Sequence, residues 1–249
     1  MPRRFHESCL IVLLAGAIAG ATACGTPRAD GSGTNAARGS TTTDSGAGAV
    51  VAPIVMDSDV ARADSARVEG SPSARVWLIM ASDFQCPYCK EWHDETYPTI
   101  VKNYVKTGKI RLAYLNFPLL GAHPHAVAAA EAAMCAAAQG RFWQLHDALF
   151  AMQDTWAPLA NPAPYFDSLA IKAGVGAAKW RHCVATNEMQ RLIDSDRARS
   201  SKSGVTSTPS FFVGNQLFAG ADQTITVLGP VLDAAIAKAN SPAKPPGGS

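Results

Sequence analysis

The segment Cys86-Pro87-Tyr88-Cys89 has the residue types and spacing that best support covalent chemistry in this sequence. Cysteines at positions i and i+3 of a helix share one face, with Cα atoms about 5 Å apart, which suits a disulfide. Proline is favoured at the first helical position, so Pro87 places Cys86 at a helix start. Unpaired backbone N–H groups and the positive end of the helix dipole favour a thiolate there. We therefore predict that Cys86 is the attacking cysteine and that Cys89 is the resolving one.

Two other uses of this cysteine pair compete with redox exchange. The pair could be a purely structural disulfide, or it could bind a metal together with His93. Tetrahedral zinc takes about four ligands, and the sequence has neither a second C-x-x-C nor a close histidine pair to complete the set. Lys90 stands where a c-type haem motif has histidine. We expect no metal, and no cofactor other than the redox-active disulfide itself.

A strand and a helix must position the two cysteines. Residues 75–82 (RVWLIMAS) form a short apolar run typical of a buried strand. The helix that opens at the cysteine motif is expected to run towards Tyr104, with a kink at Pro98. Residues 109–117 (KIRLAYLNF) alternate in polarity and predict a second strand.

The rest of the folded part is predicted to form a block of helices, a β-hairpin and a final helix. Residues 124–203 have a helical pattern and include an alanine-rich stretch, alanine being the best helix former. Gly214-Asn215 separates two short apolar runs, which is a hairpin signal. A last helix is expected within residues 224–239, although Gly229-Pro230 leaves its start open. This order predicts an α/β fold, with a mixed sheet and an inserted all-helical subdomain.

The segment from Asp83 to Cys89 (DFQCPYC) resembles the active site of the DsbA-like branch of the thioredoxin superfamily. Residues 204–213 (GVTSTPSFFV) resemble the cis-proline segment of that branch. Further similarity lies in Phe117-Pro118-Leu119, in residues 139–143 (QGRFW) and in His146-Asp147. The resemblance covers about residues 68–239 and implies a thioredoxin-like domain over residues 64–240, with the helical insertion at about 124–203.

The resemblance also assigns roles around the cysteines. It makes Pro209 the cis-proline and Thr208 the neighbour that faces the cysteines, so that the Thr208 backbone receives an extended peptide substrate. Spacing alone would make Pro209 a strand-start proline. Pro87 and Tyr88 complete the active-site loop, but Tyr88 stands where the best-known members have histidine and brings no positive charge to the thiolate. The recycling partner that the family implies is an integral-membrane, quinone-linked thiol oxidase.

Residues 1–23 have the features of a signal peptide. Arg3 and Arg4 precede an apolar run over about residues 10–19, and Ala21-Thr22-Ala23 fits a cleavage site. The run is shorter than the roughly 20 apolar residues that span a bilayer. Cys24 follows, and the segment resembles a bacterial lipoprotein signal, in which this cysteine is lipidated. The alternative is ordinary cleavage that leaves Cys24 as a free thiol.

Composition predicts that residues 24–63 are a flexible tether and that residues 241–249 are a disordered tail. Both are poor in large apolar residues, so burial cannot offset the entropy lost on ordering. With a lipid on Cys24, the tether would hold an extracytoplasmic domain, in the periplasm or on the outer cell surface, close to a membrane. The net charge of +2, from 22 basic and 20 acidic residues, gives no indication of nucleic-acid binding.

The cysteine count predicts a second disulfide. Six cysteines are encoded, and Cys9 lies within the predicted signal peptide. If Cys24 carries lipid, the active pair and two further cysteines, Cys135 and Cys183, remain as an even set. In an oxidising compartment Cys135 and Cys183 are expected to pair. Two buried free thiols are the alternative.

These observations predict an exported thiol–disulfide oxidoreductase that donates disulfides to exported proteins containing cysteines. A lowered Cys86 pKa would stabilise the reduced form as a thiolate, which makes the disulfide easier to give away. One alternative is an extracytoplasmic reductase, for example in cytochrome maturation. The other is a tethered adaptor without enzymatic activity, against which the presence of both cysteines and of Thr208-Pro209 argues.

Overall fold

In the computed structural model of the protein, the described residues are 58–241. The predicted signal peptide, Cys24, most of the predicted tether and residues 242–249 of the predicted tail lie outside them. Within residues 58–241, every helix falls short of the length and apolar character that a membrane span requires.

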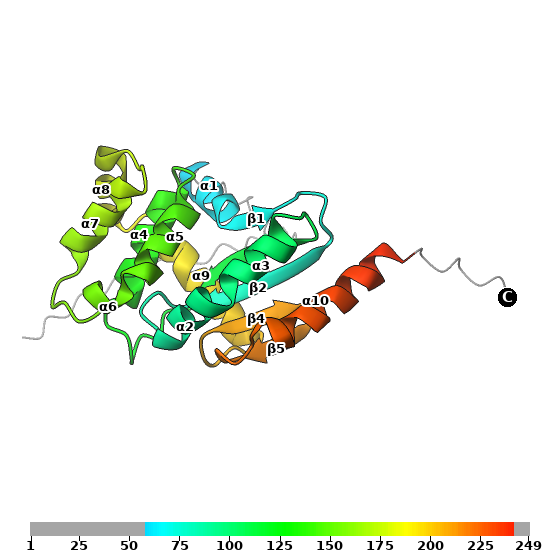
Figure 1. Cartoon of the computed structure of the whole chain (residues 1–249). Coiled ribbons are helices and arrows are strands. Elements are labelled where there is room, and N and C mark those ends of the chain that lie inside the picture. Colours follow the sequence, from blue (N-terminus) through cyan, green and yellow to red (C-terminus); the bar gives the residue numbers. More distant parts are fainter. Residues whose placement is uncertain (1–57, 242–249) are drawn as a thin grey trace, which may run out of the picture. The chain divides into compact units, whose positions relative to one another are not determined.

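Five strands form one mixed sheet in the order β1-β3-β2-β4-β5 (Figure 1). The apolar runs form its centre, where β2 (Val76–Ser82) and β3 (Ile110–Asn116) are parallel. β4 (Ser210–Val213) pairs antiparallel with β2, and the hairpin partner of β4 is β5 (Gln216–Ala219). β1 (Val68–Gly70) pairs antiparallel with β3. The predicted α/β class with a mixed sheet is confirmed.

The register brings the ends of three strands together where the active-site loop begins. Ser82 at the end of β2 is paired with Asn116 at the end of β3. Ala81 of β2 is paired with Ser210 at the start of β4. The loop that leads to Cys86 leaves the sheet directly after Ser82, so these pairings determine where the loop starts.

Three helical segments follow β2 where the sequence predicts one kinked helix. They are α2 (Pro87–Glu95), α3 (Tyr97–Ile100) and a π-helical turn, η1 (Val101–Val105). The break falls at Thr96, two residues before the predicted kink. Pro98 lacks an N–H group and is accommodated at the start of a new helix, where that group would have no partner within the helix.

The last helix, α10 (Ile225–Asn240), packs against β2 and β4 (Figure 1). It contains Pro230 in its interior, so Gly229-Pro230 does not mark its start. The Tyr104 hydroxyl donates a hydrogen bond to the Gly229 carbonyl at 3.4 Å.

Six helices lie between β3 and β4, and the described chain contains no strand in this interval. They are α4 (Ala126–Ala137), α5 (Phe142–Ala151), α6 (Gln153–Trp156), α7 (Ala163–Lys172), α8 (Ala177–Thr186) and α9 (Gln190–Lys202). Ten of the twelve residues of α4 are buried, mostly alanines, which lets α5, α7 and α8 pack closely around it. α9 returns to the sheet and packs on β3.

The insertion contains the second disulfide. Cys135 of α4 and Cys183 of α8 are joined, with their Cα atoms 5.8 Å apart. Both residues are buried, at 1% and 3% exposure. This is the pairing that the cysteine count predicts.

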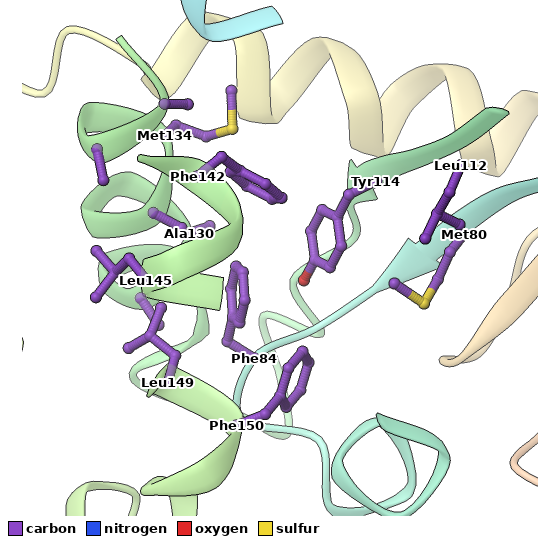
Figure 2. Packing of buried hydrophobic residues seen from close by; sticks show 14 of the residues in the cluster. Met80, Phe84, Leu112, Tyr114, Ala130, Met134, Phe142, Leu145, Leu149 and Phe150 are labelled. Carbon is purple, nitrogen blue, oxygen red and sulfur yellow. The ribbon is translucent and has the colours of Figure 1, made fainter. Parts of the chain in front are cut away.

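Aromatic rings join the insertion to the sheet, as Figure 2 shows for Phe84, Tyr114, Phe142 and Phe150. Phe84 stacks on Tyr114 with ring centroids 5.0 Å apart and lies 5.1 Å from Phe150. The Tyr114 and Phe142 rings are 5.3 Å apart. Because Phe84 is two residues before Cys86, this packing holds the active-site loop against the core.

Two N-terminal elements differ from the sequence-based expectation, namely α1 (Ser58–Ala66) and β1. The predicted end of the tether at residue 63 therefore lies too far along the chain, because α1 already begins at Ser58. Tertiary contacts account for the helix, because Ala63 is fully buried and Arg62 donates to the Ala138 carbonyl at 3.1 Å. Between α1 and β1, the buried Arg67 pairs with Asp196 of α9, with Nη2 and Oδ1 3.0 Å apart.

Candidate active site

Cys86 and Cys89 lie at the start of α2, as predicted. Cys86 is the N-cap residue with an extended backbone (φ −71°, ψ 122°), and Pro87 is the first helical residue. The backbone N–H groups of Cys89 and Lys90 donate to the Cys86 carbonyl at 3.1 and 3.2 Å. Both cysteines are free thiols and each is only 2% exposed.

The loop before β4 completes the site. The Cys86 Sγ atom lies 3.5 Å from the carbonyl oxygen of Thr208, a residue 122 positions later in the chain. Thr208 is buried, and its peptide bond to Pro209 is cis. Tyr88 is 62% exposed. The site therefore combines a nearly buried sulfur, a backbone segment in contact with it, and an exposed aromatic ring in the first turn of α2.

The two sulfurs differ in acidity. Hydrogen bonding from the Cys89 thiol lowers the pKa of Cys86 to about 6, helped by Thr208 and by the backbone N–H groups of Cys89 and Tyr88 and opposed by burial. Burial raises the pKa of Cys89 well above its usual value, and the adjacent Cys86 adds to that rise, while Ser82 opposes it. At neutral pH the pair therefore holds one thiolate on Cys86 and one proton on Cys89.

This difference predicts a pH profile for alkylation of the reduced protein. We expect the reaction of Cys86 with iodoacetamide to accelerate as the pH rises through about 6 and to level off by about pH 8, because only the thiolate reacts. Cys89 should stay unmodified over the same range. Timed alkylation followed by peptide mass spectrometry measures both rates. A Cys86 midpoint at the free-cysteine value of about 8.5 would contradict the assignment.

Comparison with known proteins places this geometry in a family. The thioredoxin family model matches residues 62–233, which include both cysteines, Thr208 and Pro209. The chain belongs to the thioredoxin superfamily. Its relatives in sequence include disulfide bond formation proteins, and its structural neighbours include DsbA-like proteins, as the active-site segment predicts.

Relatives in sequence include proteins of two kinds. The chain is 25% identical over 150 residues to the probable disulfide bond formation protein D of Bacillus anthracis, covering 59% of this chain and 69% of that protein. It is 33% identical over 153 residues to the Na⁺/H⁺ antiporter NhaA 3 of Salinispora tropica, covering 61% of this chain. The chain spans only 22% of that antiporter's length.

Solved structures share the fold. Alpha-DsbA1 of Wolbachia pipientis superposes with a TM-score of 0.60 at 22% identity, covering 70% of this chain and 92% of that one. Oxidised BdbD of Bacillus subtilis gives a TM-score of 0.62 at 18% identity, covering 69% and 92%.

Two side chains that were not among the predicted site residues hold the active-site loop. The buried Gln153 of α6 donates to the carbonyls of Phe84 at 2.7 Å and Cys86 at 3.0 Å. Gln85 donates to the Ala157 carbonyl at 3.3 Å and accepts from the His125 N–H at 2.7 Å. Gln85 precedes Cys86 directly, so its position in the sequence could have suggested a role in the loop. No pattern in the sequence around Gln153 indicates its contact with the loop.

Asp83 organises the other side of the loop. Its carboxylate accepts the backbone N–H groups of Gln85 at 2.7 Å and Leu119 at 2.9 Å. It also lies 2.7 Å from Nδ1 of His123, and its side chain is fully buried. The carboxylate thus ties the active-site loop to the loop after β3.

Two residues near the cysteine motif, Lys90 and His93, interact with groups other than the two cysteines. Lys90 forms ion pairs with Asp94 and Asp154. Among the described residues, His93 groups with His146 and Asp147.

Proposed function

We propose that the protein is an exported thiol–disulfide oxidoreductase that gives the Cys86–Cys89 disulfide to cysteines of exported proteins. The observation that carries this proposal is the pair itself, a low-pKa Cys86 at a helix start beside a buried, protonated Cys89. Membership of the thioredoxin superfamily and similarity to the probable disulfide bond formation protein D of Bacillus anthracis support it.

The acidities determine the course of the exchange. A substrate thiolate attacks Cys86 Sγ in the oxidised protein, the S–S bond breaks, and Cys89 leaves with the electron pair and takes up a proton. A second substrate thiolate then attacks the substrate sulfur of the mixed disulfide and displaces Cys86. The substrate loses two electrons and the protein gains them. Cys86 is a good leaving group in this second step because a thiol of lower pKa leaves faster.

Thr208 would orient the substrate during this exchange. Its carbonyl already lies against Cys86 Sγ, and the segment leads directly into β4. An extended peptide can add to such a backbone segment through main-chain hydrogen bonds, with little dependence on its sequence. The exposed Tyr88 ring would then face the residues that flank the substrate cysteine.

The direction of electron flow can be tested by comparing the two redox forms. Above pH 6, the lowered pKa of Cys86 stabilises the folded reduced form, because the unfolded chain binds a proton there that the folded one has lost. This stabilisation is fully present above the unfolded pKa of about 8.5 to 9 and disappears as the pH falls through about 6.

We expect urea unfolding at neutral pH to show the reduced protein as the more stable form, with the difference shrinking towards pH 5. The Cys135–Cys183 disulfide must stay intact in both samples. An oxidised form that is clearly more stable would contradict the donor role and support a reductase.

The proposal includes export through residues 1–23, a lipid on Cys24, and recycling by a membrane-bound, quinone-linked thiol oxidase. The basic start, the short apolar run and the small residues before Cys24 motivate the anchor. Mass spectrometry of membrane-extracted protein tests it, and a mature chain with an unmodified Cys24 would contradict it.

A further inference from the structure

A cluster of two histidines and one carboxylate lies between the active-site helix and the insertion. The ligand atoms of His93 on α2, His146 on α5 and Asp147 on α5 all lie within 4.8 Å of one another. Asp147 Oδ1 is 2.8 Å from His146 Nδ1 and 3.4 Å from His93 Nε2. None of these three residues takes part in the disulfide exchange described above.

The spacing is close to that of a zinc site. Nitrogen and oxygen ligands about 2.0–2.1 Å from tetrahedral zinc lie about 3.3 Å from one another. The separation between His93 and Asp147 already matches this value, and the separation between His146 and Asp147 needs to open by about half an ångström. Two imidazoles and a carboxylate are a donor set that zinc takes in proteins, with water in the fourth position.

A supporting carboxylate holds one of the histidines. His93 Nδ1 lies 3.0 Å from Oδ1 of Asp94, so the Nε2 lone pair faces Asp147 when Nδ1 carries the proton. This carboxylate–histidine arrangement is the one that commonly orients metal-ligating imidazoles.

The second histidine is held by packing. His146 is fully buried among aromatic rings, including Tyr97, Trp143 and Phe150. Among the described residues its Nε2 has no hydrogen-bond partner, so Nδ1 alone points to the cluster.

The surroundings of the cluster are acidic. Glu69 of β1 lies close enough for Asp147 to raise its pKa, after a larger effect of burial, while Lys106 acts in the opposite direction. Asp94 and Asp147 both lie against His93, and Asp94 also pairs with Lys90. Asp147 is 55% exposed and His93 13% exposed by side chain, which leaves the cluster open to an ion from solvent.

We propose that His93, His146 and Asp147 bind one Zn²⁺ ion that links the active-site helix to the helical insertion. The site does not depend on the proposed disulfide exchange. Zinc bound there joins α2 to α5 by metal–ligand bonds, and it stabilises the folded chain because the unfolded chain does not hold the three ligands together.

Zinc titration of the full chain tests this proposal. The Cys86–Cys89 pair is kept oxidised and all other free thiols are alkylated, so that no thiolate competes for the metal. We expect calorimetry to show one Zn²⁺ per chain, and His93→Gln and Asp147→Asn to weaken binding at least tenfold. Asp94→Asn should weaken it about tenfold through the orientation of His93. His182→Gln is the matched control, because His182 is exposed and its ion pair within residues 58–241 is with Glu188, away from the cluster.

Thermal unfolding supplies a second readout on the same samples. Added Zn²⁺ should raise the melting temperature of the parent and of His182→Gln, and should leave that of His93→Gln unchanged. The absence of stoichiometric binding by the parent would overturn the proposal. An affinity that is the same in parent, His93→Gln and Asp147→Asn would overturn it as well.

Discussion

Replacing Cys86 by serine should reduce the oxidation of a dithiol peptide at least about 10³-fold, to the rate measured without protein. A serine hydroxyl forms no disulfide with Cys89, so the protein has no bond to give to a substrate. The rate can be followed by mass spectrometry of the peptide, with the oxidised parent protein as reference. Substantial remaining activity would show that the exchange does not pass through Cys86.

Cys89→Ser is the matched variant and should behave differently. Cys86 lies beside Thr208, and its thiolate can still attack a substrate disulfide, which breaks that bond, releases one substrate sulfur as a thiolate and leaves the other in a mixed disulfide with Cys86. The variant has no Cys89 thiol to release that adduct. We expect covalent adducts on non-reducing gels for Cys89→Ser and none for Cys86→Ser. Accumulation of adducts by Cys86→Ser would reverse the assignment of attacking and resolving cysteine.

Replacing Cys135 and Cys183 together by alanine should lower the free energy of unfolding by about 4 kcal/mol. The bond closes a loop with a sequence separation of 48 residues, and its loss enlarges the ensemble of the unfolded chain. Urea denaturation with Cys86–Cys89 in the same redox state in both proteins measures the difference.

The double variant retains Cys86 and Cys89, so it should still oxidise a dithiol peptide at temperatures where it is folded. This activity is the control that separates lower stability from a misfolded chain. A change in unfolding free energy below about 1 kcal/mol would show that packing of α4 against α8, rather than the crosslink, holds the insertion together.

Local sequence patterns were enough for the elements whose signals lie within a few residues. The apolar runs of β2 and β3, the hairpin at Gly214-Asn215 and the helical stretch between them carry their periodicity in adjacent residues. The start of α2 is equally local, because Pro87 and the i, i+3 cysteines act within one turn. The family resemblance predicted that Thr208 faces the cysteines. In the structure its carbonyl oxygen lies 3.5 Å from Cys86 Sγ.

Tertiary packing decided what those patterns could not. α1 and β1 have weak local signals, and contacts far along the chain hold this segment, such as the pair between Arg67 and Asp196. Gln153 reaches the Cys86 carbonyl across 67 residues. His93, which the sequence offered as a possible metal ligand together with the two cysteines, groups instead with His146 and Asp147 of α5. Periodicity reports which face of an element is apolar, whereas the partner that covers this face depends on how distant elements pack.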